Sequence, residues 1–328
     1  MKKHVVLYKK LSPALMARLQ AQAEVTLIED PAQAGAQRLR EALPSAHGLL
    51  GASLRIDGEL LQLAPHLQAV ASVSVGVDKY AIDAFNERGV LLTNTPDVLT
   101  ETTADTGFAL VLATARRVVE LAGMVRDGQW TQSVGPGQFG TDVHGKTLGI
   151  VGMGRIGEAL AQRGHFGFGM GVLYHSHRPK PLVDARFSAR HCSLEALLGE
   201  ADFVCLTLPL TAETEGLIGK RELALMKPGA ILINIARGQI VDEAALIEAL
   251  SRGHLRGAGL DVFHHEPLEP TSPLLRQPNV VATPHIGSAT EETREAMAAC
   301  AVDNLLAALA GKRPQNLVNP QAWERRRP

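Results

Sequence analysis

The sequence predicts an α/β protein with two domains, each built on a parallel sheet. Three observations predict this class: short apolar strand candidates alternate with helical patterns, a glycine triplet follows one of these strands, and two long helical patterns bracket the second series of strands. The chain has 328 residues, which is long enough for two domains with a core each.

The first series of elements precedes residue 99. We expect a helix from Pro13 to Ala21 and short buried strands at residues 4–8, 25–28, 48–51, 69–73 and 90–92. A long helical pattern then runs from about Leu99 to Val125. It leads into a polar, glycine-rich segment, residues 127–142, which is typical of an arm rather than of a core.

A second series of strand candidates follows at residues 148–151, 171–174, 203–207, 230–235, 257–261 and 280–283. Six strands in succession suit a Rossmann-type doubly wound sheet. A last helical pattern, 290–310, stops at Gly311. The chain therefore crosses twice between domains, and we expect a dinucleotide-binding domain, 99–287, inserted into a smaller, flavodoxin-like substrate domain, 1–98 plus 288–328, with substrate bound in the cleft between them.

The glycine triplet, Gly152, Gly154 and Gly157, follows the apolar run 147–151 and opens a helical pattern. The first glycine permits a tight turn, the second lets the backbone approach phosphate, and the third lets the helix pack on the strand. Free amide groups and the positive dipole end at a helix start favour an anion. The motif predicts a dinucleotide site, although a strand-to-helix turn without a ligand has the same pattern.

Composition excludes several classes of function. The net charge of −1, with 20% charged residues, gives no electrostatic reason to expect a nucleic acid as partner. No stretch approaches the roughly 20 apolar residues of a membrane span, and the apolar run near the N-terminus is too short for a signal peptide. We therefore expect a cytoplasmic protein with reduced cysteines, Cys192, Cys205 and Cys300, which share no metal-type spacing.

Three residues suited to chemistry follow later strands: Arg237, Glu266 and His285. Ligands of an open parallel sheet bind outside the carboxyl ends of its strands, so these residues can meet at one site. An arginine can bind a carboxylate through paired donors, and an imidazole can give a proton to a carbonyl oxygen as hydride arrives. A neighbouring carboxylate favours the protonated imidazole. The set suits reduction of a small ketoacid, while each residue alone is also compatible with a surface or loop role.

Four ordered motifs, 148–157, 234–238, 259–267 and 284–288, resemble those of the D-isomer-specific 2-hydroxyacid dehydrogenase family. By this resemblance, Arg237 binds substrate, Glu266 is the partner acid and His285 is the proton donor. Asp261 would contact the nicotinamide amide, and the backbone amides of Val75 and Gly76 would bind the substrate carboxylate. The resemblance also implies cofactor contacts from Gly152, Gly154, Arg155, Ile156, Gly157, Thr207, Pro209, Ile235, Ala236 and Gly287.

Within the family, the chain most resembles bacterial glyoxylate/hydroxypyruvate reductases and 2-ketogluconate reductases, through residues 100–106, 140–144, 165–169 and 297–304. Asp105 stands where many relatives carry glutamate, and we interpret it as a shorter acid in the same structural role. The resemblance implies a homodimer. Trp130 and Phe139 of the arm, 127–142, are candidate dimer contacts.

The segment after strand 171–174 indicates the cofactor. An NAD-specific site places an acid there to bind the ribose 2′-hydroxyl, but residues 175–178 contain none. Ser176 and Arg178 offer a hydroxyl and a permanent cation, and His175 or His177 can add donors, so we expect NADP(H) as the preferred cofactor. The alternative is that Arg178 is a solvated turn residue and that the site also accepts NAD(H).

The predicted function is NADPH-dependent reduction of a 2-ketoacid, namely glyoxylate, hydroxypyruvate or 2-keto-D-gluconate, to the D-2-hydroxyacid. Leu54 and Arg55 lie in a loop that could face the cleft, and both are candidates for limiting substrate size; alternatively, Leu54 caps the N-terminal core. A dinucleotide-sensing, corepressor-like module is the alternative from another class. Formate oxidation is disfavoured, because relatives with that activity carry an amide at the position of Glu266.

Overall fold

The computed structural model describes residues 2–326, which divide into two compact units. The first unit comprises the residues up to Leu99 together with those from Ala289 onward, and the second comprises Thr100–Ser288. Each unit contains one parallel sheet, one of five strands and one of seven. The predicted α/β class with two sheets is confirmed.

The sheet of the first unit has the strand order β2-β1-β3-β4-β5. Its strands are β1 (Lys3–Leu7), β2 (Ala23–Leu27), β3 (Gly48–Gly51), β4 (Ala69–Ser72) and β5 (Leu91–Thr93). All neighbouring pairs are parallel. This is the order of a flavodoxin-like sheet, as expected from the sequence.

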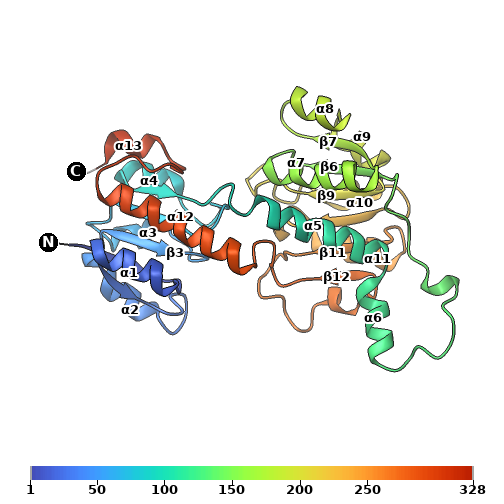
Figure 1. The fold of residues 1–328 in the computed structure, drawn as a ribbon, viewed down its shortest axis with the longest axis horizontal. Helices are drawn as coiled ribbons and strands as arrows, with labels where there is room; N and C mark the ends of the chain where they lie inside the picture. Colours follow the sequence, from blue (N-terminus) through green and yellow to red (C-terminus); the bar gives the residue numbers. More distant parts are fainter. Residues whose placement is uncertain (1, 327–328) are drawn as a thin grey trace. The chain divides into compact units, whose positions relative to one another are not determined.

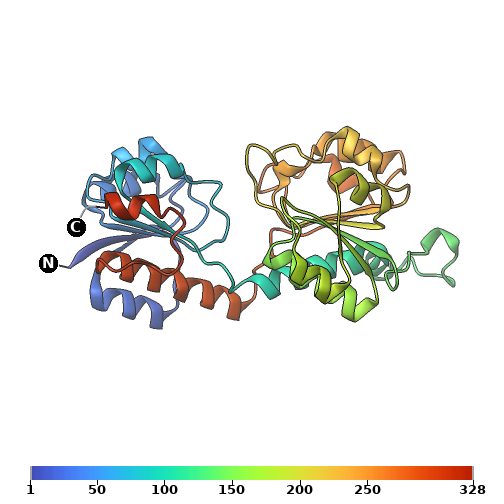
Figure 2. The same ribbon diagram turned by 90° about the horizontal axis from the view of Figure 1, so that it is seen from above.

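Helices cover both faces of this sheet (Figure 2). They are α1 (Pro13–Gln22), α2 (Ala36–Ala42), α3 (Gly58–Gln62), α4 (Ile82–Arg88), α12 (Glu291–Leu309) and α13 (Gln321–Arg325). Ser12 caps α1 by accepting a hydrogen bond from the Leu15 amide, and Pro13 occupies the first helical position. Helix α12 packs on β3, β4 and β5 and also contacts α1. Side chains of α2, α3 and α4 pack instead with Val6 and Tyr8, which point to the other face.

The sheet of the second unit has the order β12-β11-β10-β9-β6-β7-β8. Its strands are β6 (Thr147–Val151), β7 (Gly171–His175), β8 (Arg190–His191), β9 (Phe203–Leu206), β10 (Ile231–Asn234), β11 (Gly257–Leu260) and β12 (Val280–Ala282). With β6 as its first strand, this is the doubly wound dinucleotide-binding order, extended by one strand. Strand β8 was not among the predicted strands, because its two residues at the sheet edge show no apolar pattern.

Two helical layers bury the second sheet (Figure 1). The helices are α5 (Thr100–Ala115), α6 (Val118–Arg126), α7 (Arg155–Gln162), α8 (Pro181–Phe187), α9 (Leu194–Glu200), α10 (Lys220–Leu225) and α11 (Glu243–Ser251). Helices α5, α7 and α8 pack on one face, and α9, α10 and α11 pack on the other. Because both faces are covered, the inner strands β9, β10 and β11 are entirely buried, which explains their mostly apolar sequences.

The long helix predicted from Leu99 to Val125 is wrong, because it is two helices, α5 and α6. Arg117 between them has a left-handed backbone with φ of 53°. The carbonyl of Ala115 accepts the Thr141 amide at 2.8 Å, so a bond to the arm replaces the next helical bond. Apolar residues continue through both helices, and their periodicity therefore does not reveal the break.

The arm after α6 forms a long loop beside the second sheet (Figure 1). It exposes apolar side chains, as expected. Trp130 and Phe139 are 62% and 54% exposed. Arg256 donates to the Phe139 carbonyl at 2.7 Å, so the far end of the arm is attached to the body of the second unit. Among the described residues, no helix is both long and apolar enough to cross a membrane.

Candidate active site

The three glycines of the motif meet three different requirements. Gly152, directly after β6, has a φ of +99°, which other residues rarely adopt. A Cβ on Gly157 would lie 2.6 Å from the Gly152 carbonyl oxygen, so only glycine lets α7 pack this closely. A Cβ on Gly154 would meet no atom within 4 Å. The second glycine therefore borders open space, where a pyrophosphate can approach the backbone.

The start of α7 provides hydrogen-bond donors beside that space. No described residue accepts a hydrogen bond from the amides of Ile156 and Gly157, which lie in the first helical turn. Thr207, after β9, donates its hydroxyl to the Gly152 carbonyl at 2.6 Å and holds the loop. These groups fit a dinucleotide pyrophosphate, because free donors and the positive end of the helix dipole lie together.

The segment after β7 contains a cation, Arg178, that is available to bind a phosphate. Arg178 is exposed, and within residues 2–326 its guanidinium makes no hydrogen bond or ion pair. Ser176 donates to the Arg178 carbonyl at 2.8 Å, and His175 Nδ1 is hydrogen-bonded to the Cys192 carbonyl at 3.1 Å. His175 and Ser176 thus shape the turn, whereas the charge of Arg178 is available for a phosphate.

Glu213, in the loop after β9, was not among the candidate residues. Its hydrogen bond with Thr211 and its own backbone amide lower its pKa, and the charge of His177 contributes further. An acid therefore lies near the segment that was expected to contain none. Because Glu213 is far from residues 175–178 in the sequence, no local pattern predicts that it lies near them.

His285 and Glu266 are hydrogen-bonded to each other. The Nδ1 atom of His285 lies 2.8 Å from Oε2 of Glu266, while Oε1 accepts the Phe263 amide at 3.1 Å. Burial raises the pKa of Glu266, but the hydrogen bond and charge of His285, the Phe263 amide and the charge of Arg237 together lower it below its ordinary value. The carboxylate is therefore ionised at neutral pH and orients the imidazole.

Both side chains are open to a ligand, with His285 47% and Glu266 36% exposed. The backbone of His285 is left-handed, with a φ of 54°. Such strained conformations concentrate at functional sites, where the surrounding structure maintains them. The loop conformation therefore supports a functional role for His285.

Arg237 follows β10 and is partly buried. A Cβ on the next residue, Gly238, would lie 1.9 Å from the Phe263 carbonyl carbon, so only glycine lets these two loops approach. The close approach brings the charge of Arg237 near enough to lower the pKa of Glu266. Ile235 and Ala236, just before it, are buried at the strand end. The structure thus brings together all three candidate catalytic residues.

Asp261 holds the loop that carries His285. It is 1% exposed. Its Oδ1 accepts the Thr283 hydroxyl and the Ile286 amide, each at 2.7 Å, and its Oδ2 accepts the Gly287 amide at 2.8 Å. A buried carboxylate requires such donors. Its contact with a nicotinamide amide stays a prediction, as do the contacts of Arg155 and Pro209.

Val75 and Gly76 lie in the first unit, in the loop after β4. Within the described chain, their amides have no acceptor. The carbonyl of Val75 accepts the Asn94 side chain at 2.9 Å, and the carbonyl of Gly76 accepts the Ser74 hydroxyl at 3.4 Å. The loop is thus held through its carbonyls, and its amides remain available as donors to an anion.

Leu54 also lies in the first unit and is 7% exposed. It packs in the core cluster that contains Leu61 and Phe85. This position suits the alternative in which it caps the core, and its effect on substrate size stays a prediction. Arg55 is exposed, and its Nε lies 3.9 Å from Asp57 Oδ2.

Asp105 lies in α5, and its interpretation as a shorter acid in the role of glutamate stays a prediction. It forms an ion pair with Arg163, with 2.6 Å between Oδ1 and Nη2, and the same guanidinium also binds Glu101. The pairs connect α5 to the end of α7. A π-helical turn, Arg163–Gly167, continues the chain from that end.

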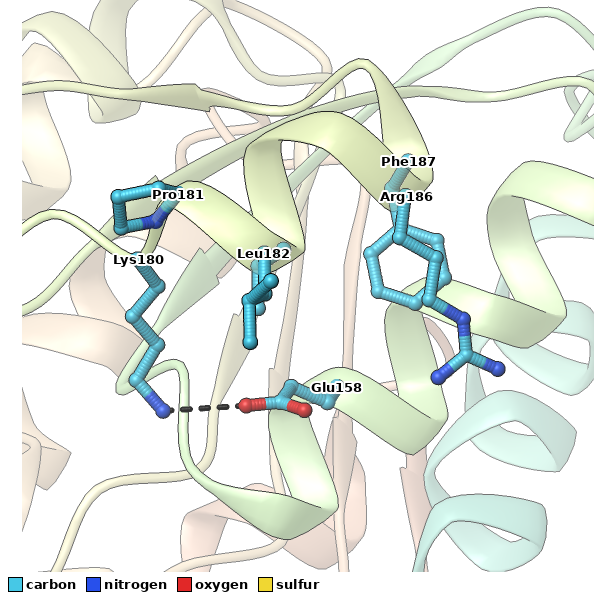
Figure 3. A pocket seen from close by; sticks show the side chains of 7 residues that line it. Glu158, Lys180, Pro181, Leu182, Arg186 and Phe187 are labelled. Atoms are coloured by element: carbon cyan, nitrogen blue, oxygen red, sulfur yellow. Dashed lines mark hydrogen bonds and ion pairs between the residues drawn. The ribbon is translucent and has the colours of Figure 1, made fainter.

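A surface groove of about 440 Å³ lies between α7 and α8 (Figure 3). Its wall contains the ion pair of Lys180 and Glu158, with 3.1 Å between Nζ and Oε1, beside Leu182 and Phe187. None of the candidate catalytic residues lines it. The groove is therefore separate from the candidate catalytic residues Arg237, Glu266 and His285.

A doubly wound sheet with this glycine loop, together with a histidine and carboxylate pair after its last strands, defines a dinucleotide-binding protein of the oxidoreductase type. Residues 108–287 match the family model described as the D-isomer specific 2-hydroxyacid dehydrogenase, NAD binding domain. The chain belongs to the D-isomer specific 2-hydroxyacid dehydrogenase family. The resemblance inferred from the sequence is confirmed.

Relatives are similar over almost the whole chain. Glyoxylate/hydroxypyruvate reductase B of Escherichia fergusonii is 57% identical over 98% of this chain and 99% of that protein. The TT0316 protein of Thermus thermophilus has a similar structure, with a TM-score of 0.89 and 48% identity over 96% of this chain and 99% of that chain.

A further structure is that of an NADPH-dependent glyoxylate/hydroxypyruvate reductase from Sinorhizobium meliloti, in complex with NADP and malonate. Its TM-score is 0.86, with 33% identity over 100% of this chain and 99% of that chain. Two of these three relatives are named as glyoxylate/hydroxypyruvate reductases, which disfavours the alternative of a sensing module.

Proposed function

We propose that this protein catalyses the NADPH-dependent reduction of a small 2-ketoacid, such as glyoxylate or hydroxypyruvate, to the D-2-hydroxyacid. One observation carries most of this proposal: His285 is hydrogen-bonded to an ionised Glu266 at 2.8 Å, beside the charge of Arg237. The E. fergusonii and S. meliloti relatives, which are named as reductases of these two ketoacids, support the choice of substrate.

Each residue of the site has a role that follows from its chemistry. His285, oriented through Nδ1 by Glu266, gives a proton from its other ring nitrogen to the substrate oxygen. Arg237 binds and polarises the ketoacid through its guanidinium donors. The amides of Val75 and Gly76 bind the substrate carboxylate, and Asp261 keeps the His285 loop in place.

The nicotinamide cofactor supplies the hydride when bound. Gly154 and the amides of Ile156 and Gly157 would hold its pyrophosphate. Arg178 would pair with the 2′-phosphate of NADPH, and the S. meliloti relative, which is NADPH-dependent, supports this preference. The negative charge of Glu213, near His177, would partly oppose binding of the 2′-phosphate. The preference for NADPH would therefore be incomplete, and NADH would bind more weakly rather than be excluded.

The direct test is the rate of NADPH oxidation with glyoxylate, hydroxypyruvate and 2-keto-D-gluconate as substrates. We expect turnover with at least one of them, and a lower kcat/KM when NADH replaces NADPH. Tight NADPH binding without turnover of any 2-ketoacid would overturn the reductase and favour a sensing module.

We also propose a cytoplasmic homodimer in which the arm contacts a second copy. Six exposed apolar side chains of α6 and the arm support this: Val118, Val119, Val125, Trp130, Val134 and Phe139. Light scattering should give twice the monomer mass for the wild type and a smaller mass for the Trp130→Ala, Phe139→Ala double variant. A monomeric wild type would contradict the dimer.

A further inference from the structure

The turn at the end of β7, residues 175–180, carries Arg178, whose charge is available for a phosphate. Arg178 is exposed, and within residues 2–326 its guanidinium makes no hydrogen bond or ion pair. The position of this charge is therefore set by the backbone of the turn and not by contacts of the side chain. Residues that hold the backbone of the turn control where Arg178 lies.

Tyr174, which precedes the turn in β7, holds its far end. The ring is fully buried, and its hydroxyl accepts a hydrogen bond from the Lys180 amide at 2.7 Å. Burial raises the pKa of this hydroxyl, the bond from Lys180 lowers it in part, and the nearby Asp184 carboxylate raises it again. The hydroxyl is therefore neutral, and it fixes the point at which the turn enters α8.

His191, in β8, holds the near end of the turn. Its Nε2 lies 2.9 Å from the Ser176 carbonyl oxygen, and because a carbonyl only accepts, Nε2 is the donor. In the parallel register of β7 and β8, His191 lies opposite Tyr174, with 5.2 Å between the ring centroids. The short strand β8 thus places a hydrogen-bond donor beside the turn.

The turn is also attached to the glycine loop. The His175 carbonyl accepts the Gly152 amide at 2.9 Å. In a bound dinucleotide, the pyrophosphate and the 2′-phosphate are separated by one ribose, so their distance is nearly fixed. A cation for the 2′-phosphate must therefore lie at a set distance from the glycine loop, and a turn held at both ends reduces the cost of ordering it there.

We propose that Tyr174 and His191 are positioning residues for cofactor selection, which fix the turn so that Arg178 meets the 2′-phosphate of NADPH. Neither residue needs to touch the cofactor. NADH has no phosphate at this place, so its binding depends much less on them. This assignment rests on the proposed preference for NADPH and names the residues that maintain it.

The test is the Kd of NADPH and of NADH, measured by calorimetry. Tyr174→Phe keeps the ring and removes the hydroxyl, and it should raise the Kd of NADPH about fivefold, the effect of one hydrogen bond. The Kd of NADH should change less than about twofold. Tyr80→Phe, which alters a buried tyrosine of the first unit, is the matched control and should change neither Kd.

His191 is only partly buried at the sheet edge and provides a second, independent test. His191→Phe removes the donor and should weaken NADPH selectively, as Tyr174→Phe does. His191→Gln offers an amide donor in place of Nε2 and should keep most of the preference for NADPH. Equal loss of NADPH affinity in His191→Phe and His191→Gln would contradict the role of this hydrogen bond.

Combination with Arg178→Gln separates positioning from a general loosening of the second unit. If Tyr174 acts through Arg178, Tyr174→Phe should no longer alter the ratio of the two Kd values once Arg178→Gln is present. A loosened unit would instead bind both cofactors more weakly, with or without Arg178. Additive effects on the ratio, or equal losses for NADPH and NADH, would overturn the proposal.

The titrations need no turnover, so they test this proposal even if no 2-ketoacid is reduced. Unchanged NADPH affinity in Arg178→Gln would overturn the assignment of Arg178 to the 2′-phosphate, and the positioning role with it. Selective loss in Arg178→Gln, with none in Tyr174→Phe and His191→Phe, would overturn the positioning role alone.

Discussion

Glu266 accepts the Nδ1 hydrogen bond of His285 at 2.8 Å. The two residues come from loops after different strands, β11 and β12. Asp261 joins these loops by accepting hydrogen bonds on both sides of Pro284 and His285, from the Thr283 hydroxyl before them and from the Ile286 and Gly287 amides after them. The geometry of the pair is therefore set by the sheet and by a buried carboxylate that itself has no role in proton transfer.

Glu266→Gln should impair reduction by removing the charge that favours the protonated imidazole. We expect kcat to fall roughly 10- to 100-fold, the effect of one charged hydrogen bond. The rate of glyoxylate reduction at saturating substrate measures the effect, with Glu269→Gln in the same loop as control. An unchanged kcat would contradict the role of Glu266.

Glu266 should also contribute stability that depends on pH. Its pKa is lower in the folded chain than its ordinary value, so its contribution is present above the ordinary pKa and is lost as pH falls through the folded pKa. The difference in unfolding free energy between wild type and Glu266→Gln should therefore shrink in acid. Denaturant titrations at several pH values measure it, and a constant difference would argue against the shift.

Alanine should affect two glycines of the motif in different ways. Gly154→Ala places a methyl group in open space, so stability should hardly change while NADPH affinity falls. Gly157→Ala places one 2.6 Å from the Gly152 carbonyl and should destabilise the second unit by about 1–3 kcal/mol. Unfolding and NADPH titrations compare the two. Equal changes in stability and in NADPH affinity in the two variants would contradict these separate roles of Gly154 and Gly157.

Arg178→Gln should weaken NADPH selectively. Removing one charge-assisted bond to phosphate should raise the KM for NADPH roughly 10- to 100-fold and leave that for NADH nearly unchanged. Arg313→Gln, an exposed arginine of the first unit, controls for net charge. If the KM values for NADPH and NADH rise by the same factor, Arg178 does not bind the 2′-phosphate.

The elements that the sequence predicts best are those with strong local patterns. Buried strands, the glycine triplet and the end of α12 before Gly311 each depend on neighbouring residues in the chain. Arg237, Glu266 and His285 could be grouped because each follows a strand of one parallel sheet, and the carboxyl ends of such strands share an edge.

Other features depend on contacts between distant segments. The break at Arg117 is linked to the arm residue Thr141, and the approach of Gly238 to Phe263 depends on how two loops fold. No local sequence pattern predicts the hydrogen bonds between Asp261 and the His285 loop either.

The most direct test of the site is His285→Gln, with NADPH binding and ketoacid reduction measured on the same preparation. His265→Gln, a neighbouring exposed histidine, is the control. We expect His285→Gln to bind NADPH like the wild type and to reduce glyoxylate roughly 100- to 10,000-fold more slowly, the usual contribution of a general acid. Reduction at the wild-type rate by His285→Gln would contradict the assignment of His285 as the proton donor.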